Sequence, residues 1–317
     1  MMKTDINLVM PDLFRKVERL MGNRFEISVV AHDKMWADDC INAAIVEIRR
    51  IEKLFTTYDD SSQVNQVNKN AGIKPVKVDQ EVLNLIERSK KISAITQGAF
   101  DISYGSIDKK LWNFDRAMTS LPDPQTAKRL VRLINYQNVI TNTENSTVFL
   151  REKGMRIGFG GIGKGYAAEN AKSVLQQKGV ESGIVNAAGD LTAWGHQPDG
   201  KPWTIGIADP DSFGKPFSYL DITDASVATS GNYEKYVIID GKKYSHTINP
   251  KTGLPVTGIK SVTIICPNAE IADAMTTPVM IMGVKVGLDM ANQIKGVGCI
   301  IIDDNDVIHT SKNIKLT

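Results

Sequence analysis

The segment Gly158-Phe159-Gly160-Gly161-Ile162-Gly163-Lys164-Gly165 separates a stretch with strand character from a stretch with helical periodicity. Residues 147–150 and a run ending at Ile157 indicate two short strands before it. After it, apolar side chains recur at helical spacing as far as Gly179, a residue typical of a helix end; they are Ala167, Ala168, Ala171, Val174 and Leu175. Glycines between a strand and a helix let backbone N–H groups approach an anion. The segment therefore predicts a strand–turn–helix unit with an anion site at its turn.

Two nucleotide-binding patterns fit this segment in part. It satisfies GxGxxG, but that pattern is weak by itself, and no acidic residue is clearly placed to hold a ribose. It departs from GxxxxGK[ST], because Gly165 stands where a P-loop carries the hydroxyl residue that binds magnesium. A P-loop nucleotidase is therefore disfavoured. A glycine turn needed only for close packing of strand and helix stays open as the alternative.

Helical and strand patterns are interleaved along the rest of the chain. Apolar side chains at helical spacing predict helices over 41–55, after Asp79 and after Asp273, and residues 113–124 indicate a loop before another short helix. Asp240-Gly241 is a strong hairpin signal. The predicted strands are 25–29, 183–185, 203–207, 236–239, 242–246, 262–266, 298–302 and 307–309. This order predicts an α+β fold, a single bilobal domain with mostly antiparallel strands and flanking helices.

Composition excludes several classes of protein. The 317 residues are 42% hydrophobic, and 38 Lys and Arg face 36 Asp and Glu, a formal net charge of +2. This balance argues against a nucleic-acid partner. No apolar run reaches the roughly 18 residues of a transmembrane segment. The three cysteines form no CxxC pair, so neither a zinc site nor a disulfide framework is predicted.

The first twenty residues bear on location. Only residues 6–10 are mainly apolar before Pro11 and Asp12, which is too short for a secretory signal, and no cysteine stands where a lipoprotein anchor would attach. We therefore expect a cytoplasmic protein. The alternative is an exported lipoprotein trimmed to its mature part.

Two places carry residue types suited to catalysis. His246 ends a predicted hairpin strand just before a turn, where a histidine can act as a general base. A satisfied or merely exposed histidine is the alternative. Asp273 and Thr277 are four residues apart on a predicted helix, so their oxygens share one face and suit magnesium near a phosphate. The alternative is that Asp273 caps the helix and Thr277 has no special role.

Three further segments are less specific. Asp101 follows Gly98-Ala99-Phe100 at a helix end and could simply hold the turn. Tyr58 precedes a turn rich in Asp and Ser, and a packed aromatic side chain is its alternative role. Residues 185–190 could be a plain exit from a strand.

Taken together, eight segments in the same order resemble the ApbE family of FAD:protein FMN transferases. The segments are Leu20–Phe25, Thr57–Asp59, Gly98–Asp101, Gly160–Ala167, Val185–Asp190, Ala228–Gly231, Tyr244–Gly253 and Ala272–Ala274. The resemblance implies an ApbE-like fold related to the T-fold, with residues 1–19 as an N-terminal extension and 20–317 as the transferase domain.

The resemblance also implies an activity. Such an enzyme binds FAD with Mg²⁺ and cleaves the pyrophosphate. It transfers FMN through a phosphoester bond to a threonine in an exposed segment of an acceptor flavoprotein, and AMP is released.

The family pattern implies a role for particular residues. The metal ligands are Asp273, Thr277 and the backbone oxygen of Gly161. The positions matching FAD contacts are Met21, Tyr58, Ala99, Phe100, Asp101, Lys164 and His246. His246 is the expected base for the acceptor threonine. Tyr58 is expected to shield the nucleotide, and residues 59–62 to form a polar rim for the acceptor.

Two departures from the family pattern matter. Gly158 stands where the family often has an aspartate, which removes one polar contact to the flavin nucleotide. Many members are exported lipoproteins, whereas an export signal is not evident here.

Two other functions compete with the transferase. One is a Mg²⁺-dependent pyrophosphatase that cuts FAD to FMN and AMP with water as the acceptor. The other is a protein that binds and stores FAD without catalysis. Asp273, Thr277 and His246 together favour catalysis, because storage requires neither a metal site nor a base.

Overall fold

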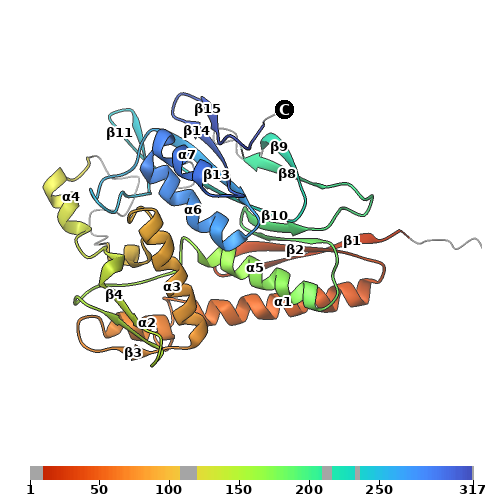
Figure 1. Cartoon of the computed structure of the whole chain (residues 1–317), viewed down its shortest axis with the longest axis horizontal. Helices are drawn as coiled ribbons and strands as arrows, with labels where there is room; N and C mark the ends of the chain where they lie inside the picture. Colours follow the sequence, from red (N-terminus) through yellow and green to blue (C-terminus); the bar gives the residue numbers. More distant parts are fainter. Residues whose placement is uncertain (1–9, 108–119, 209–215, 233–235, 316–317) are drawn as a thin grey trace, which may run out of the picture.

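The computed structural model describes residues 10–107, 120–208, 216–232 and 236–315. Within these residues the largest sheet has eight strands, and every neighbouring pair is antiparallel (Figure 1). Its strands, in spatial order, are β1 (Asp12–Leu20), β2 (Asn23–Ala31), β6 (Gly183–Ala187), β7 (Asp190–Trp194), β10 (Ala225–Gly231), β13 (Ile259–Cys266), β14 (Gly298–Asp303) and β15 (Ile308–Thr310). The predicted α+β class is confirmed.

Helices cover one face of this sheet (Figure 1). They are α1 (Lys34–Phe55), α5 (Gly163–Gln177), α6 (Ala269–Met282) and α7 (Val284–Gln293). In this layer α1 packs on β1 and β2, α5 on β6 and β7, α6 on β10 and β13, and α7 on β14. The predicted stripes are buried there, with Ile48 and Ala171 fully enclosed. Burial of these apolar faces is the main force that holds the layers together.

The opposite face of the sheet is covered by a hairpin of β8 (Trp203–Ala208) and β9 (Pro216–Ile222). Trp203 and Ile222 pack against Leu191 and Val227 of the central strands. Neighbouring residues of one strand serve different layers, as Ile264 packs under α6 and Ile265 under the hairpin. This follows from the alternation of side chains along a strand.

A smaller lobe lies beside the helix layer, at the lower left of Figure 1. It contains a sheet of order β3-β5-β4 and several short helices. Its elements are α2 (Gln63–Lys69), β3 (Val76–Lys77), α3 (Gln80–Ile95), η1 (Ile102–Ser106), α4 (Pro124–Leu130), η3 (Tyr136–Asn138), β4 (Val139–Asn142) and β5 (Thr147–Leu150). A separate hairpin pairs β11 (Tyr236–Ile239) with β12 (Lys242–Ser245), as Asp240-Gly241 predicts.

The predicted strand ending at Ile157 is wrong. The backbone N–H and C=O of Ile157 bond to the amide of Asn68, at 2.7 and 3.0 Å. The N–H and C=O of Arg156 bond in the same way to the hydroxyl of Ser106, at 2.8 and 3.0 Å. Side chains from the smaller lobe thus satisfy a backbone that would otherwise need a neighbouring strand.

Two other expectations concern chain ends and loops. Residues 12–20 form β1, which pairs with β2 along its whole length. The division into an extension (1–19) and a domain (20–317) stays a prediction, and residues 1–9 lie outside the described residues. Most of the predicted loop at 113–124 also lies outside them, and α4 follows it as expected. In the described part of the chain, no helix is both long and apolar enough to cross a membrane.

Candidate active site

The glycine segment forms the entry to α5. Ile162 is the residue before the helix, and its side chain makes no capping bond. The turn is closed by the N–H of Gly163, which donates to the carbonyl of Phe159 at 2.7 Å. One N–H of the first helical turn, that of Gly165, donates to Oδ2 of Asp273 at 2.9 Å. The start of α5 therefore binds a carboxylate of this chain, as helix N-termini bind anions in general.

Close packing explains one of these glycines. A Cβ on Gly165 would lie 2.1 Å from the carbonyl oxygen of Ala269, because the first turns of α5 and α6 cross there. A Cβ on Gly160 would meet no atom within 4 Å. The packing role is thus correct for Gly165, while Gly160 is free to face a ligand.

This contrast yields a prediction for stability. Gly165→Ala is expected to lower the free energy of unfolding by about 1–3 kcal/mol, because backbone atoms must move to admit the methyl group. The control Gly160→Ala is expected to stay within about 0.5 kcal/mol of the parent. Urea unfolding of both variants measures the difference. Equal stability of the two variants would show that α5 and α6 are not in contact at Gly165.

Lys164 lies between two buried carboxylates. Its Nζ is 2.7 Å from Oδ2 of Asp190 and 3.4 Å from Oδ1 of Asp273. Asp190 is 5% exposed and Asp273 is 4% exposed. Burial opposes the charge of Lys164, but the two carboxylates outweigh it and raise the pKa of this lysine above its usual range.

The cluster holds two carboxylates and one ammonium. Burial and then the charge of Asp273 raise the pKa of Asp190 above its ordinary range, against the opposing effect of Lys164. Two carboxylates against one ammonium leave a buried anionic excess when all three groups are ionised. Such a site favours binding of a further cation.

Other family segments converge on the same cluster. The N–H of Thr229 donates to Oδ1 of Asp190 at 3.3 Å, and Ser230 shares a 2.7 Å hydroxyl bond with Thr276. Thr276 in turn donates to the backbone carbonyl of Asp273 at 2.9 Å. Segments separated by up to about a hundred residues in the chain therefore meet around Lys164.

Two of the predicted flavin positions, and the neighbour of a third, lie beside the glycine turn. A Cβ on Gly161 would lie 3.5 Å from Cε2 of Phe100, and one on Gly163 would lie 3.6 Å from Cε of Met21. A Cβ on Gly158 would lie 3.7 Å from Thr57, the neighbour of Tyr58. The structure thus brings the segments of Met21, Tyr58 and Phe100 to one turn.

Tyr58 is not a packed aromatic side chain, because it is 99% exposed. The loop that carries it is nonetheless well held. The amide of Asn65 donates to the carbonyls of Thr57 and Asp59 at 2.9 and 2.7 Å. The hydroxyl of Ser62 donates to the backbone carbonyl of Thr56 at 2.6 Å. A rigid turn that presents an exposed ring is typical of a ligand contact.

The predicted polar rim for the acceptor, residues 59–62, stays a prediction. Asp59, Asp60 and Ser61 are exposed, as a rim requires. Ser62 is buried and caps α2 by accepting the N–H of Asn65 at 3.1 Å. Its hydroxyl is therefore committed to the fold.

Asp101 holds the turn that it begins. One carboxylate oxygen accepts the N–H and hydroxyl of Ser103 at 2.8 and 2.6 Å, and the other accepts the N–H of Tyr136 at 2.8 Å. Burial raises the pKa of Asp101 despite these bonds. The structural alternative for this residue is correct, and its contact with FAD stays a prediction.

His246 follows β12 and is partly buried. The next residues form a tight turn in which Asn249 accepts the N–H of Lys251 at 2.8 Å. Gly253 closes this turn with a φ of +73°, and its Cα faces the carbonyl of Ala127 in α4. The turn after His246 is thus anchored on the smaller lobe, whereas Lys164 and Asp273 belong to the helix layer. The role of His246 stays a prediction.

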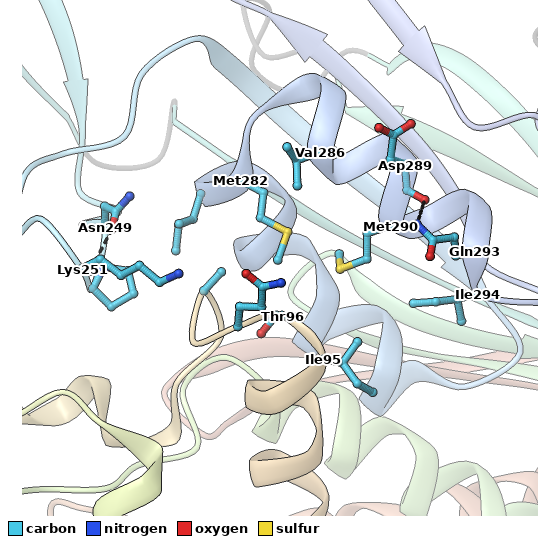
Figure 2. A pocket seen from close by; sticks show the side chains of 14 residues that line it. Ile95, Thr96, Asn249, Lys251, Met282, Val286, Asp289, Met290, Gln293 and Ile294 are labelled. Atoms are coloured by element: carbon cyan, nitrogen blue, oxygen red, sulfur yellow. Dashed lines mark hydrogen bonds between the residues drawn. The ribbon is translucent and has the colours of Figure 1, made fainter.

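A cavity of about 520 Å³ lies between the end of α3, residues 249–251 and the ends of α6 and α7 (Figure 2). Figure 2 shows Met282 and Met290 pointing into it, with Asn249 and Lys251 at the opposite side. Ala99, a predicted FAD position, also lines it. The cavity thus joins the Phe100 segment to the turn after His246.

Three oxygen donors are predicted to bind the metal ion: the side chains of Asp273 and Thr277 and the backbone carbonyl of Gly161. Thr277 and Gly161 are partly buried, and Thr277 lies one turn after Asp273 on α6. Asn268 is the residue that caps α6, so Asp273 is not the helix cap and the capping alternative is wrong. Among the described residues, no group of three or more His, Cys, Asp or Glu side chains could hold a metal ion. The predicted set contains one carboxylate, one hydroxyl and one carbonyl, so this finding leaves it a prediction.

Asp190 is the site residue that the sequence analysis missed. It stood in one of the eight segments but was assigned no role. The signal available was a carboxylate directly after the Ala188-Gly189 turn, whose residues both have positive φ. That signal does not reveal a lysine 26 positions earlier in the chain.

Fold and site together define an α+β protein in which a glycine turn, a partly buried lysine and two buried carboxylates form a polar site at the start of a helix. Comparisons with known proteins agree. A sequence model of the ApbE family matches residues 21–301, and the chain belongs to that family.

Individual relatives span most of the chain. An FAD:protein FMN transferase of Klebsiella pneumoniae (strain 342) is 32% identical and covers 92% of this chain and 90% of its own length. Another, from Treponema pallidum (strain Nichols), is 30% identical over 86% of this chain and 81% of its own length. The crystal structure of the ApbE protein of Thermotoga maritima has a TM-score of 0.85 at 29% identity, covering 95% of this chain and 97% of that one. The apo flavinyl transferase ApbE of Pseudomonas stutzeri has a TM-score of 0.83 at 25% identity, with 97% of each chain covered.

Proposed function

We propose that this chain is an FAD:protein FMN transferase. The observation that carries the proposal is the meeting of the glycine turn, Lys164, Asp190 and Asp273 in a chain whose relatives bear that name. Amide groups and an ammonium are suited to the oxygens of a pyrophosphate. The acceptor we propose is a flavoprotein with an exposed threonine segment. A cytoplasmic location stays a prediction.

The same proposal includes Mg²⁺. Asp273, Thr277 and the backbone oxygen of Gly161 are hard oxygen donors, which magnesium prefers, and the anionic excess around Lys164 supports a cation there. When bound, the ion would neutralise the pyrophosphate and the departing AMP.

Different residues of the chain bind the phosphates, contact the flavin nucleotide and accept the proton. Lys164 and the amides of the glycine turn hold phosphate oxygens, while Met21, Tyr58 and Phe100 contact the flavin nucleotide. The acceptor hydroxyl forms a bond to the phosphorus of the FMN half as the bond from that phosphorus to the oxygen of AMP breaks. His246 takes the hydroxyl proton, and AMP leaves with the bridging oxygen.

A pyrophosphatase is the second candidate, and the exposure of Tyr58 favours it to a degree. A ring that is 99% exposed does not close the site against water. Transfer requires a site from which water is excluded until the acceptor docks. Tyr58 would supply that closure only by stacking on bound flavin.

Replacing Tyr58 therefore tests both candidates. Tyr58→Ala is expected to weaken FAD binding roughly 2- to 10-fold, the worth of one ring–ring contact, and to raise the ratio of free FMN to protein-bound FMN. Tyr58→Phe keeps the ring and is the control. Chromatography of the products measures the ratio. An unchanged ratio in the alanine variant would remove Tyr58 from the shielding role.

The proposed function has a direct experiment. The protein is incubated with FAD, Mg²⁺ and a cell lysate, and the proteins are separated on a denaturing gel. We expect a fluorescent flavin band that survives denaturation and disappears with chelator. Rapid release of FMN and AMP from FAD, with no fluorescent band, would favour the pyrophosphatase. Binding of FAD with no products would favour storage.

A further inference from the structure

Asp190 is held by two different elements. Its Oδ1 accepts the backbone N–H of Thr229 in β10 at 3.3 Å, and its Oδ2 lies 2.7 Å from Nζ of Lys164 in α5. It begins β7 and is buried. A buried carboxylate with both oxygens engaged has a fixed position, so it can fix the position of its partner as well.

The second carboxylate is bound less closely by the lysine. Nζ of Lys164 lies 3.4 Å from Oδ1 of Asp273, and Oδ2 of Asp273 accepts the N–H of Gly165 at 2.9 Å. A distance of 2.7 Å is that of a strong charge-assisted bond, whereas the contact at 3.4 Å is longer and weaker. Lys164 is therefore primarily the partner of Asp190, and Oδ1 of Asp273 is only loosely engaged.

The ammonium of Lys164 can compete with a divalent cation for Asp273. If Asp190 lost its charge, Asp273 would be the remaining carboxylate beside Lys164 in the cluster. A partly buried ammonium is attracted to the nearest anion that compensates its charge. Lys164 would then occupy the oxygen of Asp273 that a divalent cation needs, and its charge would repel that cation.

We propose that Asp190 is a positioning residue, which holds Lys164 away from Asp273 and so keeps Asp273 available to a divalent cation. The proposal rests on the proposed function only in taking Asp273 as a metal ligand. Asp190 acts through Lys164 and touches neither FAD nor the metal.

The test measures metal binding without any turnover. Free Mn²⁺ is followed by electron paramagnetic resonance in the 317-residue protein with no FAD present. Asp190→Asn keeps the shape of the side chain and is expected to weaken Mn²⁺ binding roughly 10- to 100-fold, the usual cost of losing a partner that supports a metal site. Combining it with Lys164→Met is expected to restore most of the loss, because the competing ammonium is gone.

Four results would overturn the proposal. The first is an Asp190→Asn variant that binds Mn²⁺ as the parent does. The second is a double variant that stays as weak as the single one, since Asp190 would then act by itself. The third is an equal loss in Glu270→Gln, which removes another buried carboxylate of α6 that pairs with Arg88 instead of Lys164. The fourth is Asp273→Ala with the Mn²⁺ affinity of the parent, because the metal would then bind elsewhere. Thermal unfolding of each variant confirms that it is folded.

Failure of the proposed function would look different. If the parent protein labels no acceptor but Asp190→Asn weakens Mn²⁺ binding and the double variant restores it, the transferase is wrong and the positioning role stands. If the parent labels an acceptor and Mn²⁺ binding is insensitive to Asp190, the transferase stands and the positioning role is wrong.

Discussion

Asp273→Ala is expected to reduce turnover of FAD by at least roughly 100-fold, because a metal ion contributes several kcal/mol to stabilising the charges that develop on phosphate oxygens. The substitution also removes the acceptor of the Gly165 N–H and one partner of Lys164. AMP release over a Mg²⁺ titration measures the effect. Asp38→Ala, at an exposed carboxylate paired with Lys34 on α1, is the matched control and is expected to behave as the parent does.

One result with Asp273→Ala would contradict the metal hypothesis. An alanine variant that turns over FAD as fast as the parent in the presence of chelator would show that neither the residue nor a metal is needed. The other oxygen donors of the proposed set, Thr277 and Gly161, would then have no role in catalysis.

His246→Ala is expected to slow FMN transfer by roughly 10²- to 10⁴-fold, the usual contribution of a general base. FAD binding should weaken far less, because the base acts on the acceptor hydroxyl and not on the flavin. Single-turnover transfer and equilibrium binding of FAD separate the two effects. His196→Ala, at an exposed histidine outside the site, is the matched control.

A parallel loss of binding and transfer would contradict this role. If the residual rate of His246→Ala follows the fraction of enzyme with FAD bound, His246 is a binding residue only. The base would then have to be sought among other groups near the glycine turn.

Local patterns predicted most of the secondary structure. The stripe of Ile41, Ile48 and Ile51 predicted α1, since spacing along a helix determines which side chains are buried together. Asp240-Gly241 predicted its hairpin because a two-residue turn needs positive φ at both central residues, which these residue types adopt readily.

Errors arose where distant residues decide the local structure. The backbone of Ile157 is satisfied by Asn68, which lies 89 residues earlier, so no local pattern distinguishes this segment from a strand. The capping alternative for Asp273, in contrast, was wrong for a local reason, because α6 begins earlier than predicted and is capped by Asn268.

The candidate site shows the same limit more strongly. The order and spacing of the segments indicated the family. The family pattern in turn implied that Lys164 contacts FAD and that Asp273 binds the metal. Their ion pair, and the tighter one with Asp190, depend on how β7, α5 and α6 pack. Only the three-dimensional arrangement gives Asp190 a role.

Covalent attachment of FMN to a protein distinguishes the transferase from the pyrophosphatase, and it changes the mass of the acceptor. The protein is mixed with FAD, Mg²⁺ and a flavoprotein acceptor that carries an exposed threonine, and intact mass is recorded beside AMP release. We expect the acceptor to gain one FMN unit for each AMP released, and the same acceptor with that threonine changed to alanine to gain none. AMP and free FMN released at equal rates with or without acceptor, and no acceptor of increased mass, would contradict the transferase.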